Sequence, residues 1–259
     1  IYHTFQGSQV RFLHDSAPWC LEVYYCRAGR VGWSVRGESW VYLGPGDMTA
    51  QTMDCCDDST LTFPLGGALG LSFSVDLRRL EAEGPELLRE AGVRPEALRE
   101  RFSRGESASV PASPELEGIF APLFGRGPRL PYLKLKAQEL LLYLSGLEPG
   151  SARLTEYGAA QTELIRGIHR LLTDHLDQRY TIEELSRRHL INSSSLKELF
   201  KAVYGQPIAT YMKEYRVHRA MELLRDTGES VADVAAQVGY ETQGKFSQAF
   251  KDVTGMLPT

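Results

Sequence analysis

Two stretches in the last third of the chain decide the fold, because one repeats the other. Residues 181–205 read TIEELSRRHLINSSSLKELFKAVYG, and residues 230–255 read SVADVAAQVGYETQGKFSQAFKDVTG. The first six positions of the two stretches correspond at an offset of 49 residues. Their second halves correspond at an offset of 50, through the pairs Leu196/Phe246, Phe200/Phe250, Lys201/Lys251 and Gly205/Gly255. The one-residue change falls in a turn, so we interpret the stretches as two copies of one small helical unit.

Each copy contains the signals of a helix-turn-helix. Thr181 with Glu184, and Ser230 with Asp233, pair an N-cap residue with an acid three positions later, which predicts a helix start. The first helix is expected to end near residues 190–192 in copy one, and in copy two at Gly239, where glycine allows a tight turn. The second helices are expected over about 193–204 and 242–254, closed by glycines at C-cap positions, Gly205 and Gly255.

Each second helix has one apolar side and one polar side. The apolar side is expected to be buried. The polar side suits a DNA major groove, because Gln and Ser read base edges, Lys meets guanine or phosphate, and Gly allows close approach. An ordinary solvated face is the alternative for either helix alone, but the same arrangement occurs twice. We predict DNA contacts from Ser194, Ser195, Lys197, Glu198 and Lys201 in copy one, and from Gln243, Gly244, Lys245, Ser247, Gln248 and Lys251 in copy two.

The segment between the copies favours a rigid link. Apolar residues recur at helical spacing from Ile208 to Leu224. A helix of this length spans roughly 25 Å. It could hold two recognition helices about one DNA turn, near 34 Å, apart on one face of a duplex.

The net charge of the chain is compatible with DNA binding but does not predict it. The chain carries 29 Lys and Arg against 33 Asp and Glu, and residues 160–259 carry 13 of each kind. A neutral domain binds DNA only if its cations gather on one face, since affinity depends on local phosphate neutralisation. No window is apolar enough for a membrane span and no signal peptide begins the chain, so we expect a soluble, cytoplasmic protein.

The first half reads as short strands followed by helices. Leu21, Val23 and Tyr25 alternate with Glu22, Tyr24 and Cys26, a period of two that indicates a half-buried strand. Further strands and turns over residues 19–77 suggest a small barrel or jelly roll. Short helices are expected near 85–90 and 95–102, and an amphipathic helix at about 132–147, which either packs against its own barrel or pairs two chains. These signals predict domains at 1–147 and 161–259, joined by a linker at 148–160.

The repeat resembles the AraC/XylS family of transcription regulators over residues 163–259. The resemblance lies in the runs GYETQ at 239–243, KFSQAFK at 245–251 and GMLP at 255–258. Asn192, Leu196, Lys197, Gln243, Lys245 and Phe246 most resemble the branch of the pyochelin-responsive regulator. The resemblance implies an α+β chain whose cupin-like first half binds an effector and pairs two chains. It also implies that the whole chain is a transcription activator that acts on double-stranded DNA together with RNA polymerase. The branch also implies a siderophore-like effector.

Within that barrel, strand aromatics are the candidate effector contacts, because small-molecule sites are mostly apolar with few polar groups. These candidates are Tyr24, Trp33 and Trp40, for which simple core packing is the alternative. An enzymatic cupin would cluster metal-binding histidines, but the first half has only His3 and His14, before the expected strands. We therefore expect no catalytic residues, no metal and no cofactor.

A thiol- or metal-responsive regulator is the alternative function. All four cysteines, Cys20, Cys26, Cys55 and Cys56, fall in the first quarter of the chain. If Cys20 and Cys26 share one strand, they stand roughly 20 Å apart, too far to share a zinc ion. Buried or inert thiols are the interpretation that the spacing favours.

Overall fold

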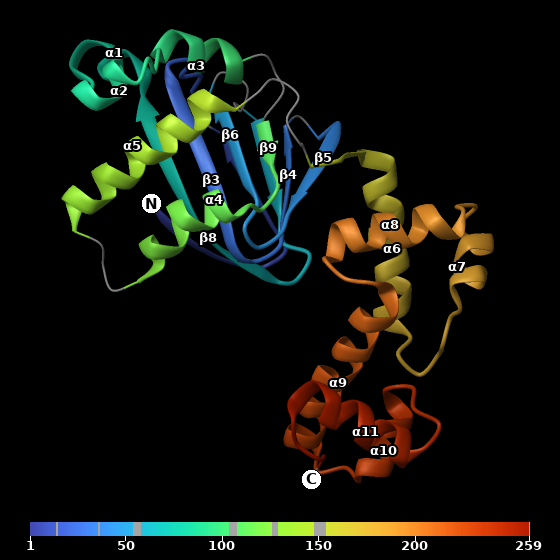
Figure 1. Ribbon diagram of the computed structural model, residues 1–259. Coiled ribbons are helices and arrows are strands. Elements are labelled where there is room, and N and C mark those ends of the chain that lie inside the picture. Colours follow the sequence, from blue (N-terminus) through green and yellow to red (C-terminus); the bar gives the residue numbers. More distant parts are fainter. Residues whose placement is uncertain are drawn as a thin grey trace. The chain divides into compact units, whose positions relative to one another are not determined.

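Strands and several helices form the first part of the chain and helices alone form the second, as Figure 1 shows for the computed structural model. The structure describes residues 1–13, 15–35, 37–53, 58–103, 108–125, 129–147 and 154–258. These residues form two units, Ile1–Ala159 and Ala160–Thr259. The predicted fold class is confirmed: an α+β chain with a β-rich first unit and an all-helical second unit. Among the described helices, none combines the length and the apolar character needed to cross a membrane.

The first unit is built from two five-stranded antiparallel sheets, an arrangement that fits the predicted cupin-like barrel. Sheet A has the order β1 (Tyr2–Gln6), β8 (Gly67–Asp76), β3 (Cys20–Gly29), β6 (Met48–Thr52) and β9 (Ala108–Val110). Sheet B has the order β10 (Glu156–Gly158), β5 (Ser39–Leu43), β4 (Val31–Val35), β7 (Asp58–Thr62) and β2 (Gln9–Leu13).

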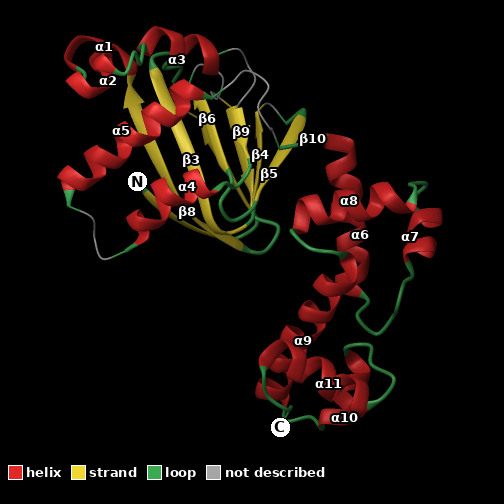
Figure 2. Cartoon of the chain, in the orientation of Figure 1, coloured by secondary structure: helices red, strands yellow, loops and turns green. Residues whose placement is uncertain are grey.

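The alternation along β3 separates two layers of the first unit. Leu21, Val23 and Tyr25 are fully buried in an apolar cluster that includes residues of the helices. Tyr24 and Cys26 instead pack with residues of sheet B, on the opposite side of sheet A. The helices of the first unit lie along sheet A (Figure 2), with bounds α1 Leu77–Glu83, α2 Glu86–Glu90, α3 Pro95–Phe102, α4 Pro114–Phe120, a 3-10 turn at Ala121–Phe124, and α5 Leu130–Gly146.

Helix α5 packs against its own barrel, as one of the two interpretations expected. Leu140, Leu141 and Leu144 are buried in the cluster on sheet A. Leu135, by contrast, is 53% exposed. The packed side of α5 therefore does not include this leucine. Lys136 contributes to the packed side through its stem and donates from Nζ to the Gly118 carbonyl at 2.9 Å.

Four strands escape the sequence prediction. β1 and β2 precede the region expected to form strands, β9 follows it, and β10 lies inside the expected linker. Tyr157 of β10 pairs with Trp40 of β5, and Leu154 packs against the interior cluster of the barrel. The described end of the linker is therefore part of sheet B. A three-residue strand is too short to show a period of two.

The second unit contains the repeat. Its helices are α6 Ala159–Asp174, α7 Ile182–Arg188, α8 Ser193–Tyr204, α9 Ile208–Thr227, α10 Val231–Gln237 and α11 Gln243–Thr254. Thr181 and Glu184 form the expected capping box at α7, with the Thr181 amide donating to Glu184 Oε2 at 2.7 Å. Ser230 caps α10 by accepting from the Asp233 amide at 3.2 Å.

The turns of the two copies share one backbone geometry but not one residue. Ile191 N–H donates to the Ser186 carbonyl, and Tyr240 N–H donates to the Ala235 carbonyl, five residues back in each case. The preceding residue has positive φ in both turns, 53° at Leu190 and 79° at Gly239. Leu190 adopts this conformation with its side chain 95% exposed. At Gly239 no side chain fits, because a Cβ would overlap the Leu176 carbonyl oxygen.

We predict opposite effects of substitution at these two turns. Leu190→Gly should raise the free energy of unfolding by about 1 kcal/mol, because it removes left-handed strain and no packing. Gly239→Ala should lower it by more than about 1 kcal/mol, since strain adds to the overlap with Leu176. Urea denaturation of the full chain measures both. Leu190→Ala is the control that keeps the strain, and stabilisation by this variant equal to that of Leu190→Gly would contradict the explanation.

Candidate functional site

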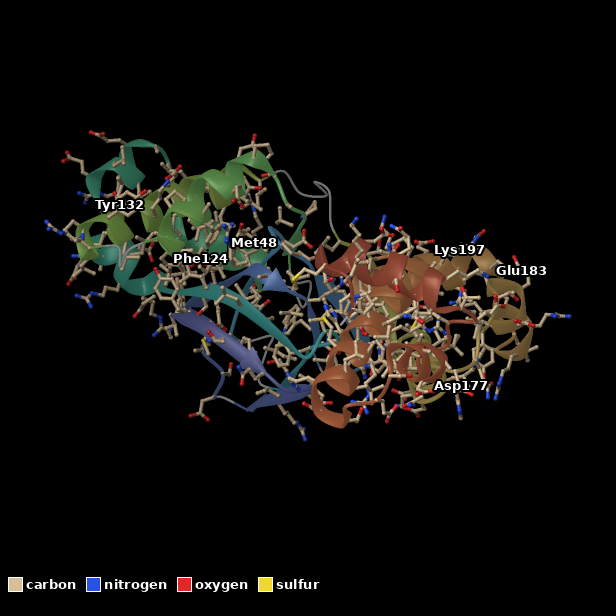
Figure 3. All side chains as sticks on the ribbon, turned by 90° about the horizontal axis from the view of Figure 1, so that it is seen from below. Met48, Phe124, Tyr132, Asp177, Glu183 and Lys197 are labelled. Carbon is tan, nitrogen blue, oxygen red and sulfur yellow. The ribbon has the colours of Figure 1, made fainter. Side chains whose placement is uncertain are left out.

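Helix α8 presents most of its predicted DNA-contacting residues to solvent. Asn192 begins the helix by accepting the Ser195 amide at Oδ1, at 2.7 Å, and Gly205 ends it with φ 84°. The side that packs inward consists of Leu196, Leu199, Phe200 and Val203. On the other side Ser194, Lys197, Glu198 and Lys201 are exposed, and Ser195 is half-buried. Lys197 lies at the surface of the second unit in Figure 3.

Helix α11 repeats this arrangement. Thr242 caps it by accepting the Lys245 amide at 3.3 Å, and Gly255 ends it with φ 77°. Phe246, Ala249 and Phe250 are buried. The predicted contacts Gln243, Gly244, Lys245, Gln248 and Lys251 are exposed, and Ser247 is half-buried. Both polar sides are therefore accessible from solvent.

Acidic residues that the sequence analysis did not single out pair with the polar side of α11. Lys245 Nζ lies 2.7 Å from Glu241 Oε2, and this ion pair lowers the pKa of Glu241. Gln248 Nε2 donates to Asp252 Oδ1 at 2.7 Å, and Lys213 Nζ lies 3.6 Å from Asp252 Oδ2. These groups are exposed, and exposed pairs contribute little stability, so a phosphate or a base edge can replace the acids.

Helix α9 carries the cores of both copies. Ile208 and Tyr211, near its N-terminus, are buried, and the Tyr211 ring contacts the rings of Phe200 and Tyr204 of α8. Val217 and Ala220, farther along, belong to the cluster that contains Phe246 and Phe250 of α11. At 20 residues, α9 is about 30 Å long. One continuous helix therefore links the two copies of the repeat, as expected.

Two arginines tie the loop before α7 to the turn of the second copy. Arg216 of α9 is 9% exposed and donates to the carbonyls of Leu176 at 3.3 Å and Gln178 at 2.8 Å. Burial lowers the pKa of Arg216. Arg179 Nε donates to the Gly239 carbonyl at 2.8 Å, and its guanidinium lies 5.1 Å from the centre of the Tyr240 ring. The loop thus fixes the second turn against α9.

We predict that Arg216→Met lowers the free energy of unfolding by about 2 kcal/mol, because two carbonyls lose a charged donor. Arg219→Met is the matched control on the same helix. Arg219 is half-exposed and pairs with Glu222, so its removal should change stability by less than about 0.5 kcal/mol. Urea denaturation of the full chain, monitored by the circular dichroism signal of its helices, measures both changes in the free energy of unfolding. Equal effects would show that the Arg216 contacts contribute nothing specific.

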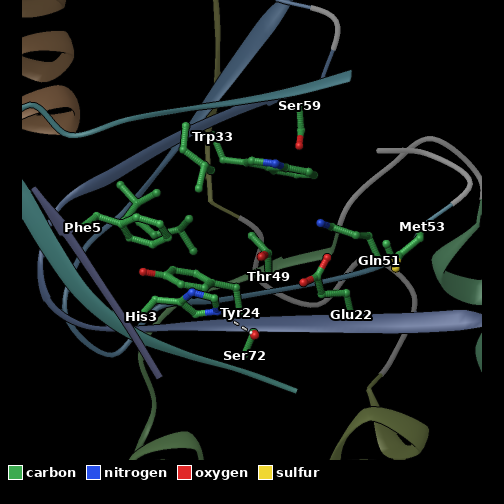
Figure 4. Close-up of a pocket in the computed structure, with 13 residues that line it drawn as sticks. His3, Phe5, Glu22, Tyr24, Trp33, Thr49, Gln51, Met53, Ser59 and Ser72 are labelled. Carbon is green, nitrogen blue, oxygen red and sulfur yellow. Dashed lines mark hydrogen bonds between the residues drawn. The ribbon is translucent and has the colours of Figure 1, made fainter. Parts of the chain in front are cut away.

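A cavity of about 240 Å³ lies in the first unit and includes two of the three predicted effector contacts. Tyr24 comes from sheet A, and Trp33 from sheet B (Figure 4). Trp40 does not line the cavity. Leu43 of its strand does, and Trp40 instead stacks with Tyr42 at 6.5 Å. Residues at odd and even positions of a strand face opposite sides, so Trp40 and Leu43 cannot share the cavity wall.

Most of the cavity lining was missed by the sequence analysis. His3 and Phe5 come from β1, which was not predicted, and Glu22, Thr49 and Gln51 come from β3 and β6. Because side chains alternate along β3, Glu22 lies on the same side as Tyr24. This alternation in the sequence would have identified Glu22 as a cavity residue. The remaining lining residues are Val31, Leu43, Met53, Ser59, Leu61 and Ser72.

Burial favours the neutral forms of two ionisable groups in the cavity, and leaves two polar atoms without a partner among the described residues. His3 Nε2 hydrogen-bonds Ser72 Oγ at 2.8 Å, and burial lowers the pKa of the imidazole. Burial likewise raises the pKa of the Tyr24 phenol. The Tyr24 hydroxyl and Gln51 Oε1 are buried without a hydrogen-bond partner in the described part of the chain.

The two described cysteines do not readily ionise to thiolates. Cys20 and Cys26 both lie on β3, so their strand spacing of roughly 20 Å holds. Burial raises the pKa of both thiols, that of Cys26 to about 12, and a protonated thiol is a weak nucleophile and metal ligand. Cys55 and Cys56, like His14, lie outside the described residues. In the described ranges, no three His, Cys, Asp or Glu side chains form a group that could hold a metal ion.

Comparison with known proteins finds matches in the helical unit. Residues 185–259 match the family described as "Helix-turn-helix domain". The transcriptional activator RhaR of Mannheimia succiniciproducens is 34% identical over 88 residues, covering 34% of this chain and 32% of RhaR. The transcriptional regulator ExsA of Pseudomonas aeruginosa is 24% identical over 125 residues, covering 48% of this chain and 45% of ExsA. A solved structure, the C-terminal domain of the response regulator AraT from Geobacillus stearothermophilus, is 28% identical with a TM-score of 0.36, covering 37% of this chain and 79% of that one.

These matches define the class of the second unit. It contains a helix-turn-helix domain, as the repeat predicted, and the curated relatives of this part are transcription regulators. The chain spans 32% of RhaR and 45% of ExsA, less than half of the length of either curated relative.

Proposed function

We propose that the protein is a sequence-specific DNA-binding transcription regulator of the AraC/XylS kind. The observation that carries the proposal is the duplication: two capped recognition helices, α8 and α11, each expose a polar side and pack on one helix, α9. A solvated helix face accounts for one such helix, but gives no reason for the second on a shared rigid link. The helix-turn-helix match and the regulator relatives support the proposal.

In the proposed complex, the glutamines and the lysines of the recognition helices have different roles. Gln243 and Gln248 read base edges in the major groove, because a primary amide offers a donor and an acceptor side by side. Lys201 and Lys251 neutralise phosphates at the C-terminal ends of the helices. Ser194, Lys197 and Glu198 face the groove from α8, and Lys245 faces it after leaving Glu241.

We propose further that the first unit senses a small-molecule effector in its cavity. Strand β5 supplies Leu43 to the cavity wall, and its opposite end pairs with β10. Ser39 Oγ donates to Glu156 Oε2 at 3.1 Å, and the Ala159 amide donates to the Glu38 carbonyl at 3.1 Å. Since α6 begins at Ala159, a ligand that shifts sheet B moves the chain where the second unit starts. Such a shift would couple effector binding to DNA binding.

The finer assignments complete this proposal. Activation follows the names of several relatives, which are transcriptional activators. Contact with RNA polymerase is proposed because the family resemblance implies it. Pairing of two chains would use α5, on which Leu130 and Leu135 are more than half exposed. The branch of the pyochelin-responsive regulator rests only on the residues quoted for it, and a cytoplasmic location follows from a role on DNA.

The groove assignments are tested by separating specific from non-specific affinity. Gln243→Ala or Gln248→Ala should weaken binding to a selected operator by about 1 to 3 kcal/mol and leave random DNA unchanged, because a bidentate base contact is lost. The operator comes from sequencing genomic fragments retained by the full chain, and fluorescence anisotropy measures both affinities. Equal losses on operator and random DNA would contradict base reading.

Lysine variants should behave differently in the same assay. Lys201→Ala or Lys251→Ala should weaken binding to every sequence and reduce the slope of log affinity against log salt by about 0.9 per phosphate contact. Lys134→Ala, an exposed lysine of α5, is the matched control and should change neither quantity. No retained genomic fragment, or an unchanged salt slope in both lysine variants, would overturn the proposed DNA interface.

A further inference from the structure

Glu198 is an acid at the centre of a recognition helix. It is the sixth of the 12 residues of α8, and it is exposed on the polar side of that helix. Ser194 lies four positions before it and Lys201 three positions after it, so the three side chains form one stripe along α8. Within the described part of the chain, Glu198 forms no hydrogen bond or ion pair. Its carboxylate is therefore available to a partner outside the chain.

The second copy has an amide at the equivalent position. Helix α11 also contains 12 residues and ends at a left-handed glycine, and Gln248 is its sixth residue. Its stripe consists of Gly244, Gln248 and Lys251, so the lysine is kept and the middle residue differs. Gln248 Nε2 donates to Asp252 Oδ1 at 2.7 Å, which leaves the second N–H and Oε1 of the amide available. The two helices therefore present different chemistry at one shared point.

A carboxylate in the major groove is selective because it only accepts hydrogen bonds. Phosphates repel it, so a place in the groove is favourable only where a base supplies a donor. Two bases offer an amino group there, cytosine through N4 and adenine through N6. Adenine also presents the acceptor N7 beside its amino group, whereas cytosine presents the donor alone. The carboxylate of Glu198 therefore selects cytosine.

An amide makes the opposite choice between these two bases. It carries a donor and an acceptor side by side, which match N7 and N6 of adenine in a bidentate pair. Cytosine offers the amide one hydrogen bond instead of two. The amide of Gln248 therefore selects adenine.

We propose that Glu198 specifies a cytosine in the half-site under α8, and that Gln248 specifies an adenine in the half-site under α11. The inference rests on the proposed function, because it takes both helices to enter the major groove. The two bases lie about one DNA turn, roughly 10 base pairs, apart. Because the two bases differ, the duplicated protein does not bind a duplicated site. The operator instead fixes which half-site each copy occupies.

Selection from a random duplex library by the full chain, followed by sequencing, tests the proposal. The unaltered chain should enrich a motif with a C·G pair that depends on Glu198. In Glu198→Gln this pair should change to A·T by at least about fivefold in enrichment, because the side chain then carries the amide of Gln248. In Glu198→Ala the position should lose its preference. A motif that keeps the same base pairs in both variants overturns the proposal.

The charge of Glu198 gives a second readout. Glu198→Gln and Glu198→Ala should strengthen binding to random DNA by about twofold or more, because a carboxylate near phosphates is removed. Both should lower the ratio of operator affinity to random affinity by about fivefold or more. Fluorescence anisotropy measures these affinities. Weaker binding to random DNA together with an unchanged ratio would overturn the assignment of Glu198 to the groove.

Two further variants complete the test. Glu183→Gln changes an exposed acid of α7, outside the recognition helices, and is the matched control that should leave the motif unchanged. Gln248→Ala should relax a different position, roughly 10 base pairs from the C·G pair, at which the unaltered chain prefers A·T. Relaxation of the C·G pair itself by Gln248→Ala would contradict the division between the two copies.

The same selection separates this inference from the proposed function. An enriched motif that does not respond to Glu198 refutes the inference and leaves the regulator intact. A library in which the unaltered chain enriches no motif refutes the proposed function, and the inference with it.

Discussion

The second unit depends on one constraint, the sharing of a single helix by two small cores. Neither copy of the repeat can bury its apolar side alone, because each consists of two short helices. Tyr211 near one end of α9 and Ala220 near the other complete the two cores. Turning one copy relative to the other would therefore require α9 to bend, or the buried side of α9 to separate from the helices that pack on it. Arg216 adds to this constraint by holding the loop before α7 and the Gly239 turn against the same helix.

The sequence predicts this unit well because its signals are local and occur twice. The caps at Thr181 and Ser230, the C-terminal glycines and the two polar sides lie at short, regular spacings, so periodicity and capping chemistry place them. Contacts that join distant segments escape the same reasoning. Nothing in the spacing of Arg216 indicates that it donates to carbonyls some forty residues earlier. Leu190 also escapes, because glycine was the only signal for a left-handed turn and this copy lacks it.

The barrel shows the opposite balance. Strand alternation predicts that β3 has two different sides, but it does not say which strands face Tyr24 across the interior. His3 and Phe5 reach the cavity because β1 pairs with β8, nearly seventy residues away. Trp40 looked equivalent to Trp33 as a strand aromatic, and only the register of β5 puts it on the other side. Aromatic content thus selects candidates, whereas long-range pairing decides among them.

The two-sided strands also bear on how such a protein diversifies. Along β3 and β6, positions that hold the helical layer alternate with positions that line the cavity, as Val23 and Met48 do with Glu22 and Thr49. Selection for a new chemical signal can therefore act on one set of positions while the other keeps the domain folded. Among descendants of a common ancestor, the positions that pack against the helices should change only to apolar residues of similar volume. The positions that line the cavity should differ between lineages that respond to different compounds.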